Sequence, residues 1–413
     1  MTAPSERRVD VAIAGASFAG MAFALALART LGPEVSIALV DRAPASLPDT
    51  GDDPRASAIS ASSQRMLDAL GLWPALAPDA EPVRRIEITD SSLEAGVRPV
   101  LLTYDTALDD GGWASFIVPN RVLAAALVDA TAREPGIARI ADAVTGYTAE
   151  ATGVRLSLAA GSSLGARLVV AADGRRSALR EAAGIKVVGW DYPQAGIVTT
   201  VGHERPHHGV ATQHFLPAGP FAILPLKADT SCITWTEDAA RAGVIIELDD
   251  DRFLAEVDRR FGGRLGRLRL AGGRRTWPLG MHLARSYIAP RLALVGDAAH
   301  GVHPIAGQGL NIALRDVAAL AECVAEAARA GFDLGEATAL ERYERWRRFD
   351  ATLSASAFDA LNRLFSSDGT LLRSTRELGL GIVDRLPVLK RTLVGEAAGL
   401  TGELPRLLTG RPV

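Results

Sequence analysis

The chain has 413 residues, of which 48% are hydrophobic and 23% are charged, the composition of a globular protein that buries a core. Its formal net charge of −3 provides no electrostatic basis for binding nucleic acid, so we expect no nucleic-acid partner. The two cysteines, Cys232 and Cys323, lie far apart in the sequence and match no metal-ligand spacing. This pattern excludes a disulfide scaffold and indicates a reducing compartment.

The first ten residues lack the charged-then-apolar order of a signal peptide. The longest apolar run near them, residues 21–28, is far shorter than the roughly 20 residues that a membrane span needs. We therefore expect a cytoplasmic protein whose contact with a membrane is at most peripheral.

The first segment has the pattern of a βαβ dinucleotide-binding unit. Residues 9–14 predict a buried strand, the sequence Gly-Ala-Ser-Phe-Ala-Gly follows at 15–20, and residues 21–30 predict a helix. A second strand at 35–40 ends at Asp41. In such units the glycines let a phosphate approach the helix start, and the acidic residue binds a ribose hydroxyl.

Ser17 stands where this motif usually has its second glycine, but serine is small enough for a close approach. A competing interpretation is the nucleophile elbow of a hydrolase, which also places a serine between a strand and a helix. That pattern needs glycine at position 19, where Ala19 stands, and it leaves Asp41 without a role. We therefore favour the dinucleotide site.

Arg55 opens the next segment, which continues as residues 56–60 and a predicted helix at 62–70. An arginine just after a dinucleotide unit can pair with phosphate oxygens, and a solvated surface arginine is the equal alternative. Residues 81–110 predict short strands joined by turns, and residues 117–130 predict a helix.

Residues 166–172 predict another buried strand, which ends in Asp173-Gly174-Arg175-Arg176. Acidic and basic residues after a second strand suggest further contacts with a long, phosphate-bearing cofactor. A simple turn capped by Asp173 is the alternative.

Between residues 189 and 277 the pattern changes to short apolar runs separated by turns, at 211–215, 220–226 and 231–236. This pattern is typical of an antiparallel sheet, to which the strands of 81–110 are expected to contribute. Such a sheet can cover the cofactor and form one wall of a substrate pocket.

Two groups of residues have the composition of metal ligands: His203, His207, His208 and His214, and Asp297, His300 and His303. The spacing of the first group fits no ligand pattern, so we interpret it as surface histidines in a hairpin loop. The second group is better explained by the loop that contains it, and we predict no metal site.

That loop follows a short buried strand at 292–295 and contains Gly296-Asp297, Pro304, Gly307 and Gly309. A helix predicted at 311–321 follows it. A strand that leads through a glycine-rich loop into a helix start presents free N–H groups and a positive dipole end. We expect an anionic or electron-rich cofactor there. The remainder is predicted to be helical, at 321–330, 340–364 and 378–400, with a break near Pro387.

Three motifs, GASFAG with Asp41, ADGRRS at 172–177 and VGDAAHGVHPIAGQGLN at 295–311, together resemble the single-component FAD-dependent aromatic hydroxylases. These enzymes have the fold of para-hydroxybenzoate hydroxylase. The sequences at 53–73, 118–123, 303–320 and 362–368 resemble, more narrowly, the branch that hydroxylates polyprenylated phenols in ubiquinone biosynthesis. Ser17 and Ala313 stand where the branch usually has glycine, and a small residue suffices at both positions.

The resemblance implies an α/β fold with a Rossmann-like FAD-binding domain, an inserted, mainly antiparallel β-sheet substrate domain and a C-terminal helical segment. The expected division is an FAD-binding domain in three parts (1–80, 111–188 and 281–330), substrate-domain strands at 81–110, a substrate-binding sheet domain at 189–280 and C-terminal helices at 331–413.

The resemblance also implies the site. Residues expected to bind FAD are Gly15, Ser17, Gly20, Asp41, Arg42, Arg55, Arg121, Asp173, Asp297, Gly309, Leu310 and Asn311. Residues expected to run beside the flavin ring and act in catalysis are Pro304, Gly307 and Gln308. No residue is identified as a general base for the phenol.

The implied reaction passes through a flavin hydroperoxide, with molecular oxygen as co-substrate and NAD(P)H or a small redox protein as electron donor. The implied partners are a polyprenylated phenol, other quinone-biosynthesis proteins and the inner face of a membrane, contacted peripherally by residues 378–413. Three alternatives remain: a hydroxylase of a small soluble aromatic compound, a non-catalytic flavin-binding component of a biosynthetic complex, and a flavin reductase or dehydrogenase.

Overall fold

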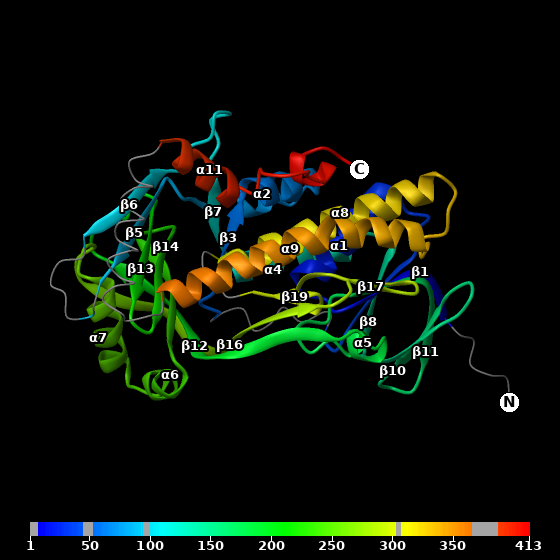
Figure 1. Cartoon of the computed structure of the whole chain (residues 1–413), viewed down its shortest axis with the longest axis horizontal. Helices are drawn as coiled ribbons and strands as arrows, with labels where there is room; N and C mark the ends of the chain where they lie inside the picture. Colours follow the sequence, from blue (N-terminus) through cyan, green and yellow to red (C-terminus); the bar gives the residue numbers. More distant parts are fainter. Residues whose placement is uncertain (1–6, 44–52, 92, 94–98, 303–306, 366–386) are drawn as a thin grey trace.

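A mainly parallel sheet forms the core of one lobe of the molecule (Figure 1). The computed structural model describes residues 7–43, 53–91, 93, 99–302, 307–365 and 387–413. The sheet places five parallel strands side by side in the order β8 (Ile137–Ala141), β2 (Ile37–Asp41), β1 (Arg7–Ala14), β11 (Ser163–Ala171) and β18 (Leu292–Leu294). The short β17 (Ile288–Ala289) and the hairpin of β9 (Val144–Ala149) and β10 (Val154–Leu158) add antiparallel pairs.

Helices cover this sheet, so its central strands are apolar on both faces. The alanine-rich α1 (Phe18–Leu31) packs against α8 (Gly309–Arg329) and α4 (Asn120–Arg133). The side chains of Ala22 to Leu27 are all fully buried. Short elements complete the lobe: α2 (Ala61–Ala69), α3 (Trp73–Leu76), α5 (Ala178–Ala182) and the 3₁₀ helices η2 (Gly296–Ala298) and η4 (Arg406–Thr409). The helix α11 (Pro387–Ala397) precedes η4 in the chain.

A second sheet forms the other lobe. Its order is β19 (His300–Gly301), β16 (Leu268–Ala284), β12 (Val187–His203), β15 (Thr230–Asp238), β14 (Gly219–Leu226), β13 (Val210–Leu216), β5 (Arg85–Asp90) and β6 (Val100–Asp105). All neighbouring strands are antiparallel except β13 and β5. One face packs on α6 (Ala239–Ile246) and α7 (Asp250–Phe261), and the other packs on a small sheet of β3 (Ala56–Ser60), β7 (Ser115–Pro119) and β4 (Glu81–Pro82).

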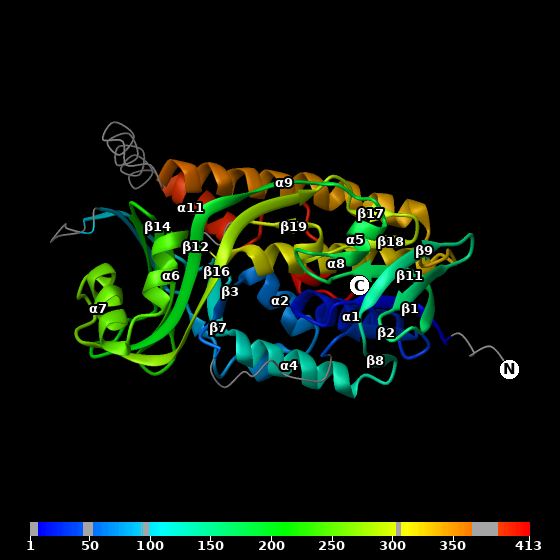
Figure 2. The same cartoon turned by 90° about the horizontal axis from the view of Figure 1, so that it is seen from below.

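Three long elements connect the lobes. The strands β12 and β16 run as a curved ribbon from one lobe into the other. The helix α9 (Ala337–Phe365) lies along both lobes (Figure 2). The hydroxyl of Tyr192 in β12 donates a hydrogen bond of 2.6 Å to Asp359 of α9. The α9 helix therefore contacts the sheet lobe as well as α8.

The predicted fold class is confirmed, and β13, β14 and β15 lie where short antiparallel strands were predicted. The predicted helix at 117–130 was wrong at its start, because β7 occupies 115–119 and α4 begins at Asn120. Phe116, Ile117 and Val118 favour a strand, and Pro119 lacks the N–H that a helix interior needs.

The region 189–277 also contains two helices that the strand pattern did not predict. Both begin at an aspartate whose side chain accepts backbone N–H groups, Asp238 before α6 and Asp249 before α7. The predicted helices at 311–321 and 321–330 are one helix, α8. Of the helix predicted at 378–400, residues 378–386 lie outside the described residues, and Pro387 is the first residue of α11.

The interpretation of the four histidines as surface residues was wrong for two of them. His203 is 7% exposed and His214 is 1% exposed. His203 donates to the carbonyl oxygen of Arg205, and His214 is hydrogen-bonded to the Thr89 hydroxyl. Within the described ranges, no three His, Cys, Asp or Glu side chains lie close enough together to hold a metal ion.

Candidate functional site

Three predicted loops meet at one edge of the parallel sheet. Ala14 of β1 pairs with Ala171 of β11, and Ala171 pairs with Leu294 of β18. The three strands thus end in register. The loops at 15–20, 172–177 and 295–300 leave the same edge side by side. Ligands of open α/β sheets bind at the carboxyl ends of the strands, so this edge is the candidate site.

The two glycines of the first loop allow α1 to start against the sheet. Gly15 has a φ of 103°, and a Cβ atom on it would lie 2.2 Å from the carbonyl oxygen of Ala172. A Cβ atom on Gly20 would lie 1.9 Å from the carbonyl oxygen of Gly15. Both positions therefore require glycine, and the helix start lies directly above the strand ends.

The start of α1 is left open for an anion. Ser17 is the N-cap residue, but its exposed side chain makes no capping hydrogen bond. The N–H group of Met21 is the first to bond within the helix, to Ser17. Among the described residues, the N–H groups of Phe18, Ala19 and Gly20 have no partner. Such a helix start fits a pyrophosphate group.

Asp41 closes the loop between β1 and α1. One carboxylate oxygen accepts the N–H group of Ala16 at 2.8 Å, and the other accepts that of Ala43 at 3.0 Å. Each oxygen has a second lone pair, so Asp41 can also accept a ribose hydroxyl. Arg42 follows and is exposed.

Asp173 follows β11 and has an unused oxygen. One carboxylate oxygen accepts the N–H group of Leu179 at 3.3 Å. The other oxygen is buried and has no hydrogen-bond partner in the described part of the chain. Buried carboxylate oxygens are almost always hydrogen-bonded, so this atom fits a hydroxyl donor of a ligand.

Asp297 presents its side chain at the same edge. It is the only exposed residue of the segment 296–300. Its backbone carbonyl accepts a hydrogen bond of 2.8 Å from His282 Nε2. Asp297 lines a cavity of about 230 Å³ together with Gly309 at the start of α8. Asp297 and Gly309, from the two ends of the third motif, are therefore brought together at this cavity.

The start of α8 is a second helix end without a side-chain cap. The N–H groups of Gly309, Leu310 and Asn311 have no partner among the described residues. Gly307, with a φ of 63°, and Gln308 precede them. Pro304 lies outside the described residues.

The Asn311 side chain is fully engaged within the protein. Its amide oxygen accepts the Ser60 N–H group at 3.0 Å, and its amide nitrogen donates to Ala58 and Gln308 at 2.8 and 3.1 Å. Asn311 thus fixes α8 on β3. We expect its contact with a cofactor to come from the backbone.

The backbone segments that carry Arg55 and Arg121 lie side by side, because the N–H group of Asn120 donates to the Arg55 carbonyl at 2.9 Å. Arg55 pairs with Asp53 at 2.7 Å. Burial alone would raise the pKa of Asp53, but the hydrogen bonds and charge of Arg55 outweigh it and lower that pKa. The exposed Arg121 has no ion-pair or hydrogen-bond partner within the described ranges.

Trp277 and His282, which line the cavity, were not singled out from the sequence. Arg175, one of the basic residues of the second motif, lines it as well. Burial, with the nearby charges of Arg180 and Arg175, lowers the pKa of His282, so its ring is neutral at neutral pH. Trp277 packs over Gly196, where a side chain would collide with the indole. Trp277 and His282 belong to β16, whose sequence has no motif, so only the fold brings them here.

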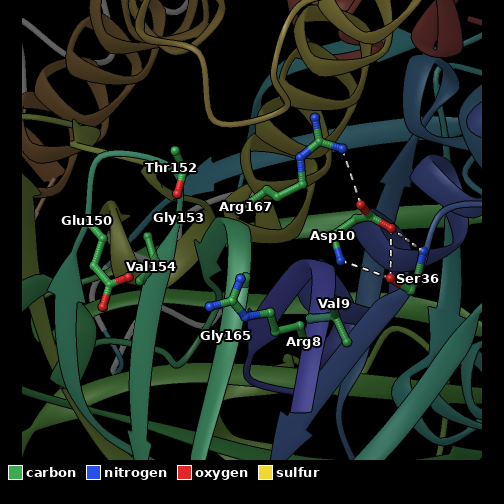
Figure 3. Close-up of a pocket in the computed structure, with 11 residues that line it drawn as sticks. Arg8, Val9, Asp10, Ser36, Glu150, Thr152, Gly153, Val154, Gly165 and Arg167 are labelled. Atoms are coloured by element: carbon green, nitrogen blue, oxygen red, sulfur yellow. Dashed lines mark hydrogen bonds and ion pairs between the residues drawn. The ribbon is translucent and has the colours of Figure 1, made fainter. Parts of the chain in front are cut away.

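A second cavity, of about 300 Å³, lies at the opposite edge of the parallel sheet (Figure 3). Residues near the amino ends of β1 and β11 line it, and three of its polar residues, Asp10, Ser36 and Arg167, are hydrogen-bonded together. Asp10 accepts hydrogen bonds from Ser36 and Arg167 (Figure 3). This second cavity is not lined by the start of α1 or of α8.

The residues at the carboxyl edge fit FAD. The first turns of α1 and α8 lie beside the same loop residue, because a Cβ atom on Gly296 would be 3.4 Å from the Cβ atom of Ala19 and 3.2 Å from that of Ala313. Two helix starts without side-chain caps suit a pyrophosphate and an electron-rich ring. Asp41, Asp173 and Asp297 offer acceptors for the hydroxyl groups between them.

Comparisons with known proteins show the family of the chain. The family model described as FAD binding domain matches residues 8–353. The ubiquinone hydroxylase UbiL of Rhodospirillum rubrum is 42% identical over 418 residues, which cover 100% of this chain and 95% of that protein. The 3-demethoxyubiquinol 3-hydroxylase of Escherichia coli is 34% identical, with 95% and 98% of the two chains covered.

The crystal structure of p-nitrophenol 4-monooxygenase from Pseudomonas putida has the same fold, with a TM-score of 0.77 at 20% identity, covering 95% of this chain and 98% of that one. The relatives match along the whole chain and not only in the nucleotide-binding motifs. The chain therefore belongs to the FAD binding domain family of flavin-dependent aromatic monooxygenases, and within it to the ubiquinone-biosynthesis hydroxylase branch.

Proposed function

We propose that this FAD-dependent monooxygenase hydroxylates the aromatic ring of a polyprenylated phenol in ubiquinone biosynthesis. The observation that carries the proposal is the 42% identity, over the full chain, to a protein named ubiquinone hydroxylase. The two helix starts without side-chain caps, and the Asp173 carboxylate oxygen that has no partner in the described part of the chain, support it.

The residues of the first lobe would hold the cofactor. Gly15, Ser17 and Gly20 would seat the pyrophosphate, and Asp41 would bind the adenosine ribose. Asp297 would accept hydroxyl groups of the ribityl chain. When bound, FAD supplies the redox chemistry that activates molecular oxygen, with electrons from NAD(P)H or a small redox protein.

The start of α8 would stabilise negative charge on the flavin ring. Three of its N–H groups have no partner among the described residues, and they lie at the positive end of a 21-residue helix. Gly307 and Gln308 would run beside the ring. A closed, dry site there limits the loss of activated oxygen as hydrogen peroxide.

The sheet lobe would form the substrate wall. Ala211, Leu224 and Trp277 belong to the apolar cluster between this sheet and β3 and β7. Gln213 follows Ala211 by two positions, so its side chain lies on the same face. Its amide nitrogen is buried without a partner among the described residues, and a ring oxygen of a phenol is a suitable acceptor.

A long prenyl tail requires access to a membrane. No helix in the described part of the chain is long and apolar enough to cross one. On α9, however, the side chains of Phe349 and Leu353 are 75% and 60% exposed, one turn apart, beside the exposed Arg345 and Arg348. Apolar side chains flanked by arginines suit the surface of an anionic membrane, so we include α9 with residues 378–413 in the proposed peripheral contact.

Replacing both Phe349 and Leu353 with aspartate is expected to reduce binding to vesicles that contain anionic lipid, on the order of tenfold. The control is Val244→Asp, which changes an apolar side chain of α6 that is 66% exposed in the other lobe. Flotation of the purified proteins with vesicles measures the bound fraction. Equal flotation of the double variant, the control and the wild type would rule out α9 as the contact.

Single-turnover labelling tests the proposed reaction without knowledge of the electron donor. The holoenzyme is reduced chemically without air and then mixed with ¹⁸O₂ and a short-chain prenylated phenol. We expect a product with one labelled ring hydroxyl, since a monooxygenase transfers one oxygen atom and releases the other as water. Quantitative hydrogen peroxide and unchanged phenol would oppose the proposal, and product from 4-hydroxybenzoate alone would favour a soluble aromatic substrate.

A further inference from the structure

The loop that carries Asp297 is held by a buried network of charged side chains. Asp316 of α8 is 0% exposed, and its carboxylate accepts three hydrogen bonds. The donors are the Gly296 N–H group at 3.0 Å, His300 Nε2 at 2.5 Å and Arg347 Nε at 2.9 Å. One carboxylate thus fixes both ends of the segment 296–300.

Arg347 links this carboxylate to α9. Its side chain is 4% exposed, and it also bonds Asp350 at 2.5 Å. Burial alone would raise the pKa of Asp316, but the charges of His300 and Arg347 outweigh it and lower that pKa. The network therefore holds a negative carboxylate in the core beside the candidate FAD site.

Two further side chains hold the middle of the loop. His282 of β16 donates to the Asp297 carbonyl, and Arg180 of α5 donates to the Ala298 carbonyl, both at 2.8 Å. Side chains from α5, α8 and β16 thus hold the backbone of 296–300, and Arg347 of α9 acts on it through Asp316, while the side chain of Asp297 is exposed.

Buried ion pairs seldom contribute net stability compared with apolar residues of the same size, so their presence calls for a structural role. Here the role follows from the geometry. Without Arg347, the Asp316 carboxylate loses the donor that orients it. We expect the hydrogen bond to Gly296 to weaken, so that the backbone carrying Asp297 is held less firmly.

We propose that Arg347 and Asp316 are positioning residues that set the FAD affinity of this enzyme through the Gly296–Asp297 loop. This inference rests on the proposed contact between Asp297 and FAD. The α9 helix, which also bonds to β12 through Asp359, is thereby part of the cofactor site although no residue of α9 lines its cavity.

The test is the FAD dissociation constant of Arg347→Met, measured by flavin fluorescence on reconstituted protein. We expect it to rise on the order of tenfold, with a changed visible circular dichroism of the bound flavin. Arg347→Lys restores a charge near Asp316 and should recover part of the loss. Arg342→Met is the matched control, because it removes a more exposed ion pair, with Glu326, between the same two helices. Its dissociation constant should stay within about twofold of wild type.

Two further variants make the result decisive. If Arg347→Met does not fold, His300→Phe keeps a ring beside Tyr287 but removes one donor to Asp316, and it should shift the dissociation constant in the same direction. Asp297→Asn tests the assignment of the cofactor contact itself. Unchanged FAD affinity in Asp297→Asn would overturn that assignment. Weakened affinity there, with wild-type affinity in Arg347→Met or His300→Phe, would overturn the positioning role alone.

Discussion

Replacing Gly20 with alanine is expected to abolish stable FAD binding. The added Cβ atom would lie 1.9 Å from the carbonyl oxygen of Gly15 and 3.3 Å from the Cβ atom of Ala172. The first neighbour is backbone and cannot rotate away. The helix cannot retreat easily either, because Ala22 to Leu27 are fully buried against neighbouring elements.

The start of α1 must therefore shift, and with it the N–H groups proposed to seat the pyrophosphate. Overpacking of this kind costs about 1–3 kcal/mol of folding free energy. The bound flavin per chain after gel filtration and the melting temperature measure the two effects.

Gly243→Ala is the control for this substitution. Gly243 lies inside α6, and a Cβ atom there would meet nothing within 4 Å. Alanine has the higher helix propensity, so this variant should gain up to about 1 kcal/mol and keep its flavin. A Gly20→Ala protein that retains flavin as Gly243→Ala does would refute the role of the tight turn.

The substitution Glu237→Ala is expected to destabilise the sheet lobe by about 3 kcal/mol. The carboxylate of Glu237 pairs with Arg260 at 2.8 Å, and the two side chains are 3% and 1% exposed. The guanidinium of Arg260 also lies 4.0 Å from the ring centre of Trp235. Without Glu237, the buried guanidinium loses a fully buried carboxylate partner, while Glu256, whose side chain is 27% exposed, stays paired with it.

Denaturant unfolding monitored by tryptophan fluorescence measures this loss. Asp129→Ala is the control, since it removes an ion pair with Arg133 whose side chains are 56% and 76% exposed. Exposed pairs of this kind contribute about 0.3–0.5 kcal/mol. Equal unfolding midpoints for the two variants would show that the buried pair does not stabilise the lobe.

The cofactor edge could be predicted because its signals are local. Each of the three loops directly follows a short apolar run, and parallel strands end at one edge of their sheet. The registers of Ala14, Ala171 and Leu294 agree with this.

The side chains that hold the Asp297 loop could not be predicted from the sequence, because the contacts they make are not local. Arg347 lies on a helix rich in charged residues, where the sequence pattern predicts that an arginine is exposed to solvent. His282 lies in a long strand without a motif. Their partners are separated from them by 31 and 15 residues. Asn311 shows the same limit within a motif, because its side chain holds β3 in place.

The start of α4 and the existence of α6 and α7 could not be predicted from the hydrophobic pattern alone. The run from 115 to 119 is apolar in the manner of either a strand or a helix start, and pairing with β3 makes it a strand. The caps at Asp238 and Asp249 were readable signals for α6 and α7, but the surrounding strand pattern masked them.

Mass spectrometry of the quinone lipids in cells that lack this gene tests the central claim most directly. The proposed function predicts an accumulated prenylated phenol that lacks one ring oxygen, and its structure would name the ring position. The wild-type gene should restore ubiquinone, whereas the Gly20→Ala gene should not. Unchanged ubiquinone and no such precursor, in a strain without another hydroxylase of this branch, would contradict the proposed function.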